Sequence, residues 1–245
     1  DWQDVPSALF SFGEFGHVTV YQLKDQKLVQ TIEFRANLTV ANVTKYDSDG
    51  RVETSYAYNP GGTKIVSRSV YTYFSKDKED KDYSLLKMVE TYNIGDLNIV
   101  DLKAVPKDAG TLESRTHYLG RHAEADDEKG VSEAMLGRFD YLGLGLVDYT
   151  ENYLKPLVPG EAPRFLSIVE QQYDIFQLVR SVTYKNVEGS DVCGSGFSGC
   201  EAVSMDEFTY YPGTDDIDYT TRWLITANDL DNRVRHSVFR TEQVD

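Results

Sequence analysis

The chain has 245 residues, and its 40 Asp plus Glu against 25 Lys plus Arg give a formal net charge of −15 at pH 7. This length allows one large all-β domain or two small ones, and either can bury a core. The acidic balance argues against nucleic acid or an anionic membrane as the main partner, because phosphate binding requires clustered Lys and Arg. No apolar run in the sequence approaches the roughly 18 residues of a membrane-spanning helix.

The strongest local signal is an alternation of apolar and polar residues with period two, which is typical of half-buried antiparallel strands. It is clearest where Ile32, Phe34, Ala36, Leu38 and Val40 alternate with polar residues. The same pattern predicts strands at 18–23, 31–40, 52–58, 65–74, 84–92, 97–105, 112–119, 165–185, 203–211, 221–227 and 233–240.

Polar and glycine-containing segments separate these strands. Residues 24–27, 47–50 and 59–62 predict tight turns, and the charged residues 76–82 predict a solvated loop. Helix signals are few, with Ser132 as one candidate cap for a short helix that ends by Gly137. We therefore predict a single all-β domain over residues 1–245, with an irregular middle section around 120–163. Its expected fold is an antiparallel meander that forms a sandwich or a partly open barrel, with few short helices.

Two cysteines and two sequons bear on the compartment. Cys193 and Cys200 flank a glycine-rich spacer that can curl back, so we predict a local disulfide formed in an oxidising compartment. Two free thiols or a partial metal site are the alternatives. Asn37 and Asn42 each begin an Asn-x-Thr triplet, which is compatible with glycosylation. The chain begins at Asp1, which fits either a processed mature protein or a trimmed chain, and we expect an extracellular or periplasmic location.

A short motif occurs twice. Residues 46–52 read Tyr-Asp-Ser-Asp-Gly-Arg-Val, and residues 228–234 repeat its Asp-x-Asp-x-Arg-Val core. Tyr-x-Tyr follows the first copy at 56–58 and again at 71–73, so each unit predicts a hairpin with tyrosines paired across strands. The region 45–74 resembles the YD-repeat hairpins of RHS-type proteins and related tyrosine-rich β proteins of bacterial envelopes. This resemblance implies a meandering antiparallel sheet in an extracytoplasmic protein, and it implies no catalytic residue.

The aspartates of the two repeats are also the candidate metal ligands. Asp47, Asp49, Asp229 and Asp231 are spaced like part of a calcium loop, but neither copy has the bidentate Glu that completes an EF-hand. We expect these residues to form turns, with weak calcium binding as the alternative. No other cofactor is expected.

Other chemical motifs are weak. The glycines at 194, 196 and 199 match a dinucleotide-binding fingerprint, but they lie between the two cysteines and no helix pattern follows them. His117 and His122 precede an acidic stretch, and their spacing suits joint metal ligation on neither a helix nor a strand. We expect both histidines in a solvated loop. Nothing in the sequence selects a catalytic pair from its 40 carboxylates.

Together these features predict an exported, non-enzymatic structural or adhesive module of the cell envelope or extracellular space, such as a subunit of a larger assembly or filament. The expected partner is a protein or a second copy, joined through unpaired sheet edges, because such edges present unpaired backbone groups. The alternative is a carbohydrate- or small-ligand-binding β protein, or a carboxylate-based hydrolase. Nucleic-acid binding is not expected.

Overall fold

The computed structural model describes residues 7–13, 16–80, 83–97, 99, 101–106, 109–119, 145–156, 161–174, 177–186, 199–226 and 229–240. Within these residues the secondary structure is almost all β, with two short 3₁₀ helices and no α-helix. No helix in these ranges has the length and apolar character needed to cross a membrane.

The described strands are β1 (Ser7–Phe12), β2 (Val18–Lys24), β3 (Lys27–Phe34), β4 (Val40–Tyr46), β5 (Val52–Tyr58), β6 (Ile65–Tyr73), β7 (Leu86–Asn93), β8 (Thr111–Tyr118), β9 (Val147–Leu154), β10 (Arg164–Asp174), β11 (Gln177–Asn186), β12 (Cys200–Tyr210), β13 (Ile217–Thr226) and β14 (Asp229–Arg240). The 3₁₀ helices are η3 (Gly95–Leu97) and η4 (Leu102–Ala104).

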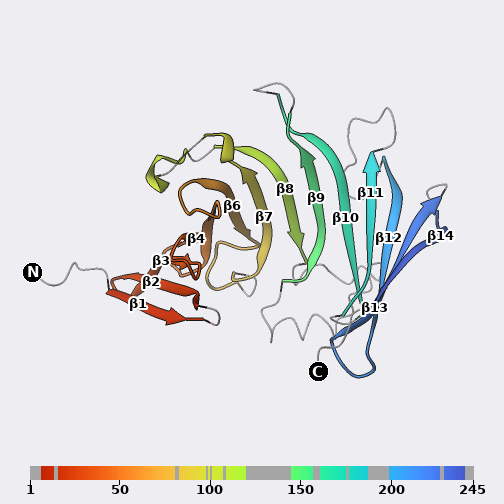
Figure 1. Cartoon of the computed structure of the whole chain (residues 1–245), viewed down its shortest axis with the longest axis horizontal. Helices are drawn as coiled ribbons and strands as arrows, with labels where there is room; N and C mark the ends of the chain where they lie inside the picture. Colours follow the sequence, from red (N-terminus) through yellow and green to blue (C-terminus); the bar gives the residue numbers. More distant parts are fainter. Residues whose placement is uncertain are drawn as a thin grey trace, which may run out of the picture. The chain divides into compact units, whose positions relative to one another are not determined.

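Hydrogen bonds connect the strands in chain order from β1 to β14 as one meander sheet (Figure 1). The predicted all-β class and antiparallel meander are therefore confirmed. Along its length the chain divides into two compact units. Unit 1 contains Asp1–Tyr73 and Met88–Ser114, and unit 2 contains Phe74–Lys87 and Arg115–Asp245. The single domain over 1–245 stays a prediction.

The turns form where the sequence predicts them. Asp25 and Gln26 connect β2 to β3 with φ angles of 50° and 64°, the left-handed values that a two-residue hairpin turn requires. Gly50 has a φ of 84° in the turn between β4 and β5, where the backbone N–H of Asp47 donates to the carbonyl of Arg51. Glycine adopts this angle without a steric penalty.

The prediction of one strand over residues 31–40 is wrong. β3 ends at Phe34 and β4 begins at Val40, with a turn between them. Inside the turn, the N–H of Leu38 donates to the carbonyl of Arg35 at 2.8 Å. Leu38 has a φ of 61° and a side chain that is 70% exposed. The apolar alternation continues through this segment, but Leu38 does not share the buried face of the strands.

The predicted strand at 97–105 is also wrong, because η3 and η4 lie in this segment. Ile99, Leu102 and Val105 recur every third residue, which matches the three residues per turn of a 3₁₀ helix. All three pack against the buried cluster of unit 1. The carboxylate of Asp101 caps η4 by accepting a hydrogen bond from the N–H of Lys103.

The core of unit 1 lies under this segment. Its buried residues are Tyr56, Ile65, Ile94 and Ala109. Gly110 has a φ of 104°, and a Cβ at this position would lie 2.5 Å from Cγ2 of Ile94. Only glycine therefore allows the chain to pass this close to Ile94 as it enters β8.

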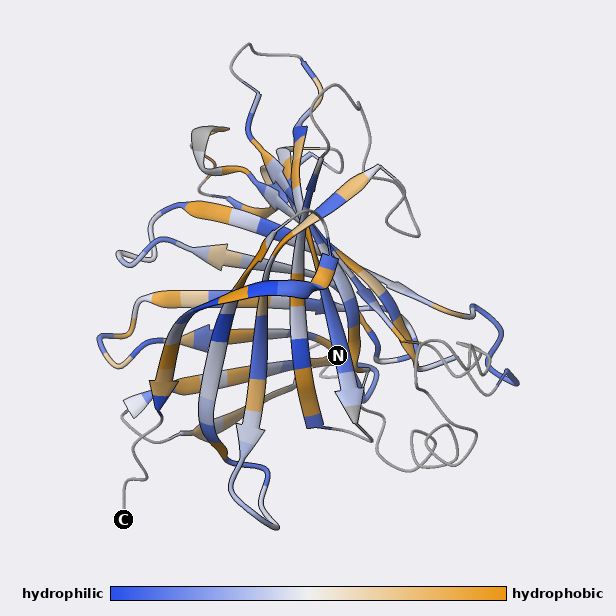
Figure 2. Ribbon diagram, turned by 90° about the vertical axis from the view of Figure 1, so that its right-hand side faces the viewer, coloured by the Kyte–Doolittle hydropathy of each residue, from blue (hydrophilic) through white to orange (hydrophobic). Residues whose placement is uncertain are grey.

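The core of unit 2 follows cross-strand pairs through β10, β11 and β12. Ile168, Val182 and Met205 are fully buried, and Val182 pairs directly with Met205. Apolar and polar residues alternate along the strands (Figure 2). The predicted strand at 165–185 is the β10–β11 hairpin, whereas the sequence predicts neither β1 nor β9. The helix predicted at Ser132 lies outside the described residues.

Candidate functional site

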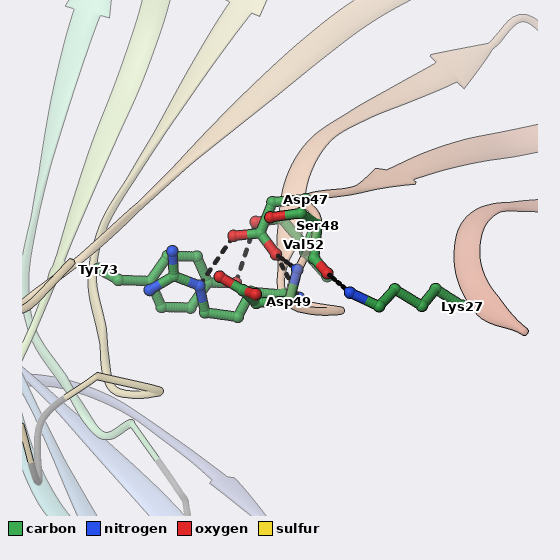
Figure 3. Close-up of polar contacts among 7 residues, drawn as sticks. Lys27, Asp47, Ser48, Asp49, Val52 and Tyr73 are labelled. Atoms are coloured by element: carbon green, nitrogen blue, oxygen red, sulfur yellow. Dashed lines mark hydrogen bonds and ion pairs between the residues drawn. The ribbon is translucent and has the colours of Figure 1, made fainter. Parts of the chain in front are cut away.

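Asp47 organises the turn between β4 and β5 (Figure 3). Its Oδ1 accepts hydrogen bonds from the N–H groups of Asp49 at 2.9 Å and Arg51 at 3.0 Å, and its Oδ2 accepts one from Nε of Arg51 at 2.8 Å. Burial tends to raise the pKa of the Asp47 carboxyl, but the hydrogen bonds from Arg51 outweigh it and hold the pKa below its usual value. Both carboxylate oxygens of Asp47 therefore serve the hairpin.

The same hairpin is attached to its neighbours on both sides. The guanidinium of Arg51 lies 4.7 Å from the ring centroid of Tyr73 on β6, and the hydroxyl of Tyr73 donates to the carbonyl of Val52 at 3.0 Å. On the other side, Nζ of Lys27 donates to the carbonyl of Ser48 at 3.1 Å (Figure 3). These contacts assign the first repeat a structural role.

The second pair of calcium candidates lies at the start of β14. Oδ1 of Asp229 accepts a hydrogen bond from the N–H of Asp231 at 3.0 Å, which is the geometry of an Asx turn. No group of three His, Cys, Asp or Glu side chains suited to a metal ion occurs in the described ranges. Weak calcium binding at Asp47, Asp49, Asp229 and Asp231 stays a prediction. No ligand cluster in the described ranges supports it.

Cys200 begins β12 and is buried against Ile168. Cys193, the glycines at 194 and 196, and His122 lie outside the described residues. The disulfide between Cys193 and Cys200 therefore stays a prediction.

The two sequons lie close together in unit 1. Asn37 is exposed in the turn between β3 and β4, and Asn42 lies in β4, where its amide donates to Oε2 of Glu33 at 2.9 Å. Both asparagines line a surface cavity of about 790 Å³. Their glycosylation stays a prediction.

Three glutamates on one face of unit 2 each accept a hydrogen bond from an aromatic side chain. Tyr153 donates to Glu151 at 2.7 Å, Tyr184 to Glu170 at 2.9 Å, and Nε1 of Trp223 to Glu207 at 2.7 Å. The strand register places these groups on the same face as the buried residues Ile168, Val182 and Met205. These carboxylates are half-buried, and such partners offset the cost of their partial desolvation.

Around Glu151, β8 contributes two basic side chains. Oε2 of Glu151 lies 3.8 Å from Nε2 of His117 and 3.9 Å from the guanidinium of Arg115. The pKa of the Glu151 carboxyl is lowered, chiefly by His117, against the opposing effect of burial. Burial, with Glu151 adding to it, raises the pKa of Tyr153 to about 12. The carboxylate is thus charged and the phenol neutral at pH 7, which fixes the direction of their hydrogen bond.

The expectation that His117 lies in a solvated loop is wrong. The residue belongs to β8, and its ring stacks on Tyr149 with centroids 4.2 Å apart and planes at 15°. The residue spacing in the sequence carries a signal for this site. Arg115 and His117, like Glu151 and Tyr153, are two residues apart and so share one face of a strand.

Glu207 joins three strands. Its Oε1 lies 3.3 Å from the guanidinium of Arg180 on β11 and 3.4 Å from that of Arg233 on β14. Arg233 also lies 4.7 Å from the ring centroid of Trp223 on β13. The carboxylates of these clusters accept hydrogen bonds from their own sheet.

β1 and β14 are the first and last strands in the order of the sheet, and each has one hydrogen-bonded neighbour among the described strands. We call them the terminal strands. β1 contains no charged residue, and Leu9, Phe10 and Phe12 are 60%, 62% and 81% exposed. β14 also exposes apolar residues, but charged residues alternate with them. Its exposed apolar residues are Val234, Val238 and Phe239, and its charged residues are Asp229, Asp231, Arg233, Arg235 and Arg240.

A groove of about 410 Å³ lies on the β13–β14 hairpin. Three cross-strand pairs line it, and they follow one another on the same face. These pairs are Tyr219 with Arg240, Thr221 with Val238, and Trp223 with Arg235. We call this the hairpin groove. The sequence does not predict this groove, because the pairing depends on a bulge near His236 that shifts the register between Arg222 and Trp223.

Comparison with known proteins identifies no family for this chain. No protein-family model matches the sequence, and no curated protein matches it. Among solved structures, the chain is similar to a porin-like protein from Bacteroides uniformis, with 8% sequence identity and a TM-score of 0.18 over 96% of this chain and 93% of the other. A TM-score this low gives no information about the fold or function of this chain.

Proposed function

We propose that this chain is a structural or adhesive module of the cell envelope or extracellular space, and that it associates with a second copy of itself through β1. The observation that supports this proposal best is the surface of β1. An uncharged terminal strand with three exposed large apolar side chains is unusual, because proteins that remain monomeric protect such edges with charges, prolines or bulges.

The exposed side chains of β1 lie on both faces of the strand. Phe10 and Phe12 pair with Val20 and Val18 on one face, and Leu9 projects from the other. A second β1 strand in antiparallel pairing would bury apolar side chains on both faces and add backbone hydrogen bonds. Because both copies use the same strand, the pairing is twofold and closes as a dimer.

The proposed location rests on the sequence. The predicted disulfide between Cys193 and Cys200 requires an oxidising compartment. The resemblance of residues 45–74 to YD-repeat hairpins also favours an extracytoplasmic location. The contacts of Asp47, Arg51 and Tyr73 provide the cross-strand packing that such a hairpin needs, which supports a scaffold role for this segment.

Sedimentation velocity over a range of protein concentrations tests the self-association. The wild-type chain should show a reversible monomer–dimer equilibrium, and the double variant Phe10→Lys/Phe12→Lys should sediment as a monomer, because paired strands would then place like charges side by side. Leu38→Lys is the matched control, since Leu38 is similarly exposed but lies in the turn between β3 and β4.

The control variant should dimerise like the wild type. A wild-type chain that stays monomeric at high concentration would refute the proposal. So would a dimer that survives the double substitution in β1.

A further inference from the structure

The hairpin groove has a floor and two walls of matching composition. The middle pair, Thr221 with Val238, is small and forms the floor. Each wall combines one aromatic ring with one arginine, because Tyr219 pairs with Arg240 and Trp223 pairs with Arg235. Three residues lie between Tyr219 and Trp223, so their positions are about 13 Å apart along β13. The groove therefore has an aromatic residue of β13 at each end and both arginines on β14.

The tryptophan wall is held in place before any ligand arrives. Nε1 of Trp223 donates to Glu207 at 2.7 Å, and the guanidinium of Arg233 lies 4.7 Å from the ring centroid. Arg233 pairs with Ile225, and its guanidinium also lies 3.4 Å from Oε1 of Glu207, the carboxylate that binds Trp223. A ring fixed in this way loses little conformational entropy when a ligand stacks on it.

The two arginines give the groove a positive charge within a chain of net charge −15. Nε of Arg240 lies 3.4 Å from Oδ1 of Asp218, and the Arg240 side chain remains 78% exposed. Arg235 is exposed and forms no hydrogen bond or ion pair with the described part of the chain. A guanidinium with free donors binds a carboxylate through two parallel hydrogen bonds.

From this geometry we propose that the hairpin groove binds an acidic glycan, a chain of uronic acid residues. The sugar rings stack against Trp223 and Tyr219, whose flat faces are apolar, while ring carboxylates bind Arg235 and Arg240. The volume of about 410 Å³ lies in the range of small-ligand sites. This site is separate from β1, so it does not depend on the proposed self-association.

An acidic peptide is a weaker fit to the same charges. The groove lies on the face of the hairpin, where the backbone groups of β13 are used in pairing with β12 and β14. A peptide in the groove would therefore find side chains rather than the backbone donors and acceptors of a free strand edge. A sugar needs only the ring faces and the guanidinium groups.

Calorimetric titration of the full chain at low ionic strength tests the proposal. The probes are a short oligogalacturonate, its methyl-esterified form, and a polyglutamate peptide of equal charge. We expect the oligogalacturonate to bind, and the esterified form and the peptide to bind at least about tenfold more weakly, since the ester removes the charge-assisted hydrogen bonds and the peptide lacks the rings.

Variants then locate the site. Arg235→Gln should weaken oligogalacturonate binding about tenfold, and Tyr219→Ala should weaken it without changing the net charge. Arg222→Gln is the matched control, because it removes the same charge from the opposite face of β13 and should leave binding unchanged. Thermal unfolding of each variant checks that the hairpin is still folded.

Three results would overturn the proposal. They are no oligogalacturonate binding, equal loss of binding in the Arg235 and Arg222 variants, and polyglutamate binding as tight as that of the sugar. The second result would indicate non-specific charge attraction, and the third an acidic protein segment as the partner.

Discussion

The two terminal strands differ in the charge of their exposed side chains. Among the described strands, β1 pairs with β2 alone, and it exposes Leu9, Phe10 and Phe12 without a charged neighbour in the strand. β14 exposes a comparable set of apolar residues, but arginines and aspartates alternate with them, and a bulge near His236 disrupts its register. Charges and bulges are the usual devices that prevent edge-to-edge pairing. This difference favours β1 over β14 as the strand for the proposed self-association.

The strands also differ in how they are held. Side-chain contacts with two other strands hold β14, since Arg233 contacts Glu207 on β12 and Trp223 on β13. On β1, the hydroxyl of Ser11 lies 3.4 Å from the hydroxyl of Tyr21, a contact that stays within the β1–β2 hairpin. A protected edge that is firmly held suits a binding groove, and an apolar edge held by its own hairpin suits pairing with another chain.

The largest expected effect comes from removing the anchor of β14. Glu207→Ala leaves Arg180, Arg233 and Nε1 of Trp223 without their shared acceptor, so we expect a loss of about 2–3 kcal/mol in the free energy of unfolding. Urea denaturation measures this loss. Glu207→Gln keeps an acceptor for Trp223 and should lose less. Equal losses in both variants would show that only the charge matters.

Removing the charges of β14 should make the two edges alike. In the double variant Arg235→Leu/Arg240→Leu, two exposed leucines replace the guanidinium groups, and their partial burial should favour association by about 1–2 kcal/mol. Sedimentation velocity should then detect species heavier than a dimer, because each chain has two usable edges. If the variant forms only dimers, the charges are not what protects β14.

Salt should affect β1 dimerisation and glycan binding in the hairpin groove in opposite directions. Screening reduces the repulsion between chains of charge −15, so β1 dimerisation should strengthen with ionic strength. Binding of an acidic glycan to Arg235 and Arg240 should weaken over the same range. We expect changes of about threefold to tenfold between 0.1 M and 1 M salt, as the Debye length falls from about 10 Å to about 3 Å. Salt slopes of the same sign would contradict the assignment of two separate sites.

The smallest effect is expected at the start of β14. Asp229 accepts one hydrogen bond from a backbone N–H, whereas Asp47 accepts two and also an ion-paired one from Arg51. Asp229→Ala should therefore cost about 0.5 kcal/mol of stability, and Asp47→Ala about 1–2 kcal/mol. Thermal unfolding measures both. A chelator that lowers the midpoint of the wild-type chain would instead indicate bound calcium.

The sequence predicted the hairpins well, because their signals are local. Alternation located β5 and β6, and Asp-Gly chemistry located the turn at Gly50. The prediction of strands failed where alternation continued through a turn, as at Leu38. It also failed where apolar residues recurred at every third position, as at Ile99 and Leu102.

Neither candidate site was predictable in the same way. The groove between Tyr219 and Trp223 depends on which residues of β14 lie opposite them, and a one-residue bulge decides that register. The contact between Glu207 and Arg233 joins strands separated by β13. The sequence shows the apolar residues of β1, but only the fold shows that this strand lies at the end of the sheet.

Hydrogen exchange at two protein concentrations tests whether β1 pairs with the β1 strand of a second copy. Amides of β1 that point away from β2 should exchange quickly in dilute solution and become protected as the concentration rises, since pairing with a second β1 gives them acceptors. Exchange from β14 should not change. Protection that appears in β14 instead, or in neither strand, would contradict the account.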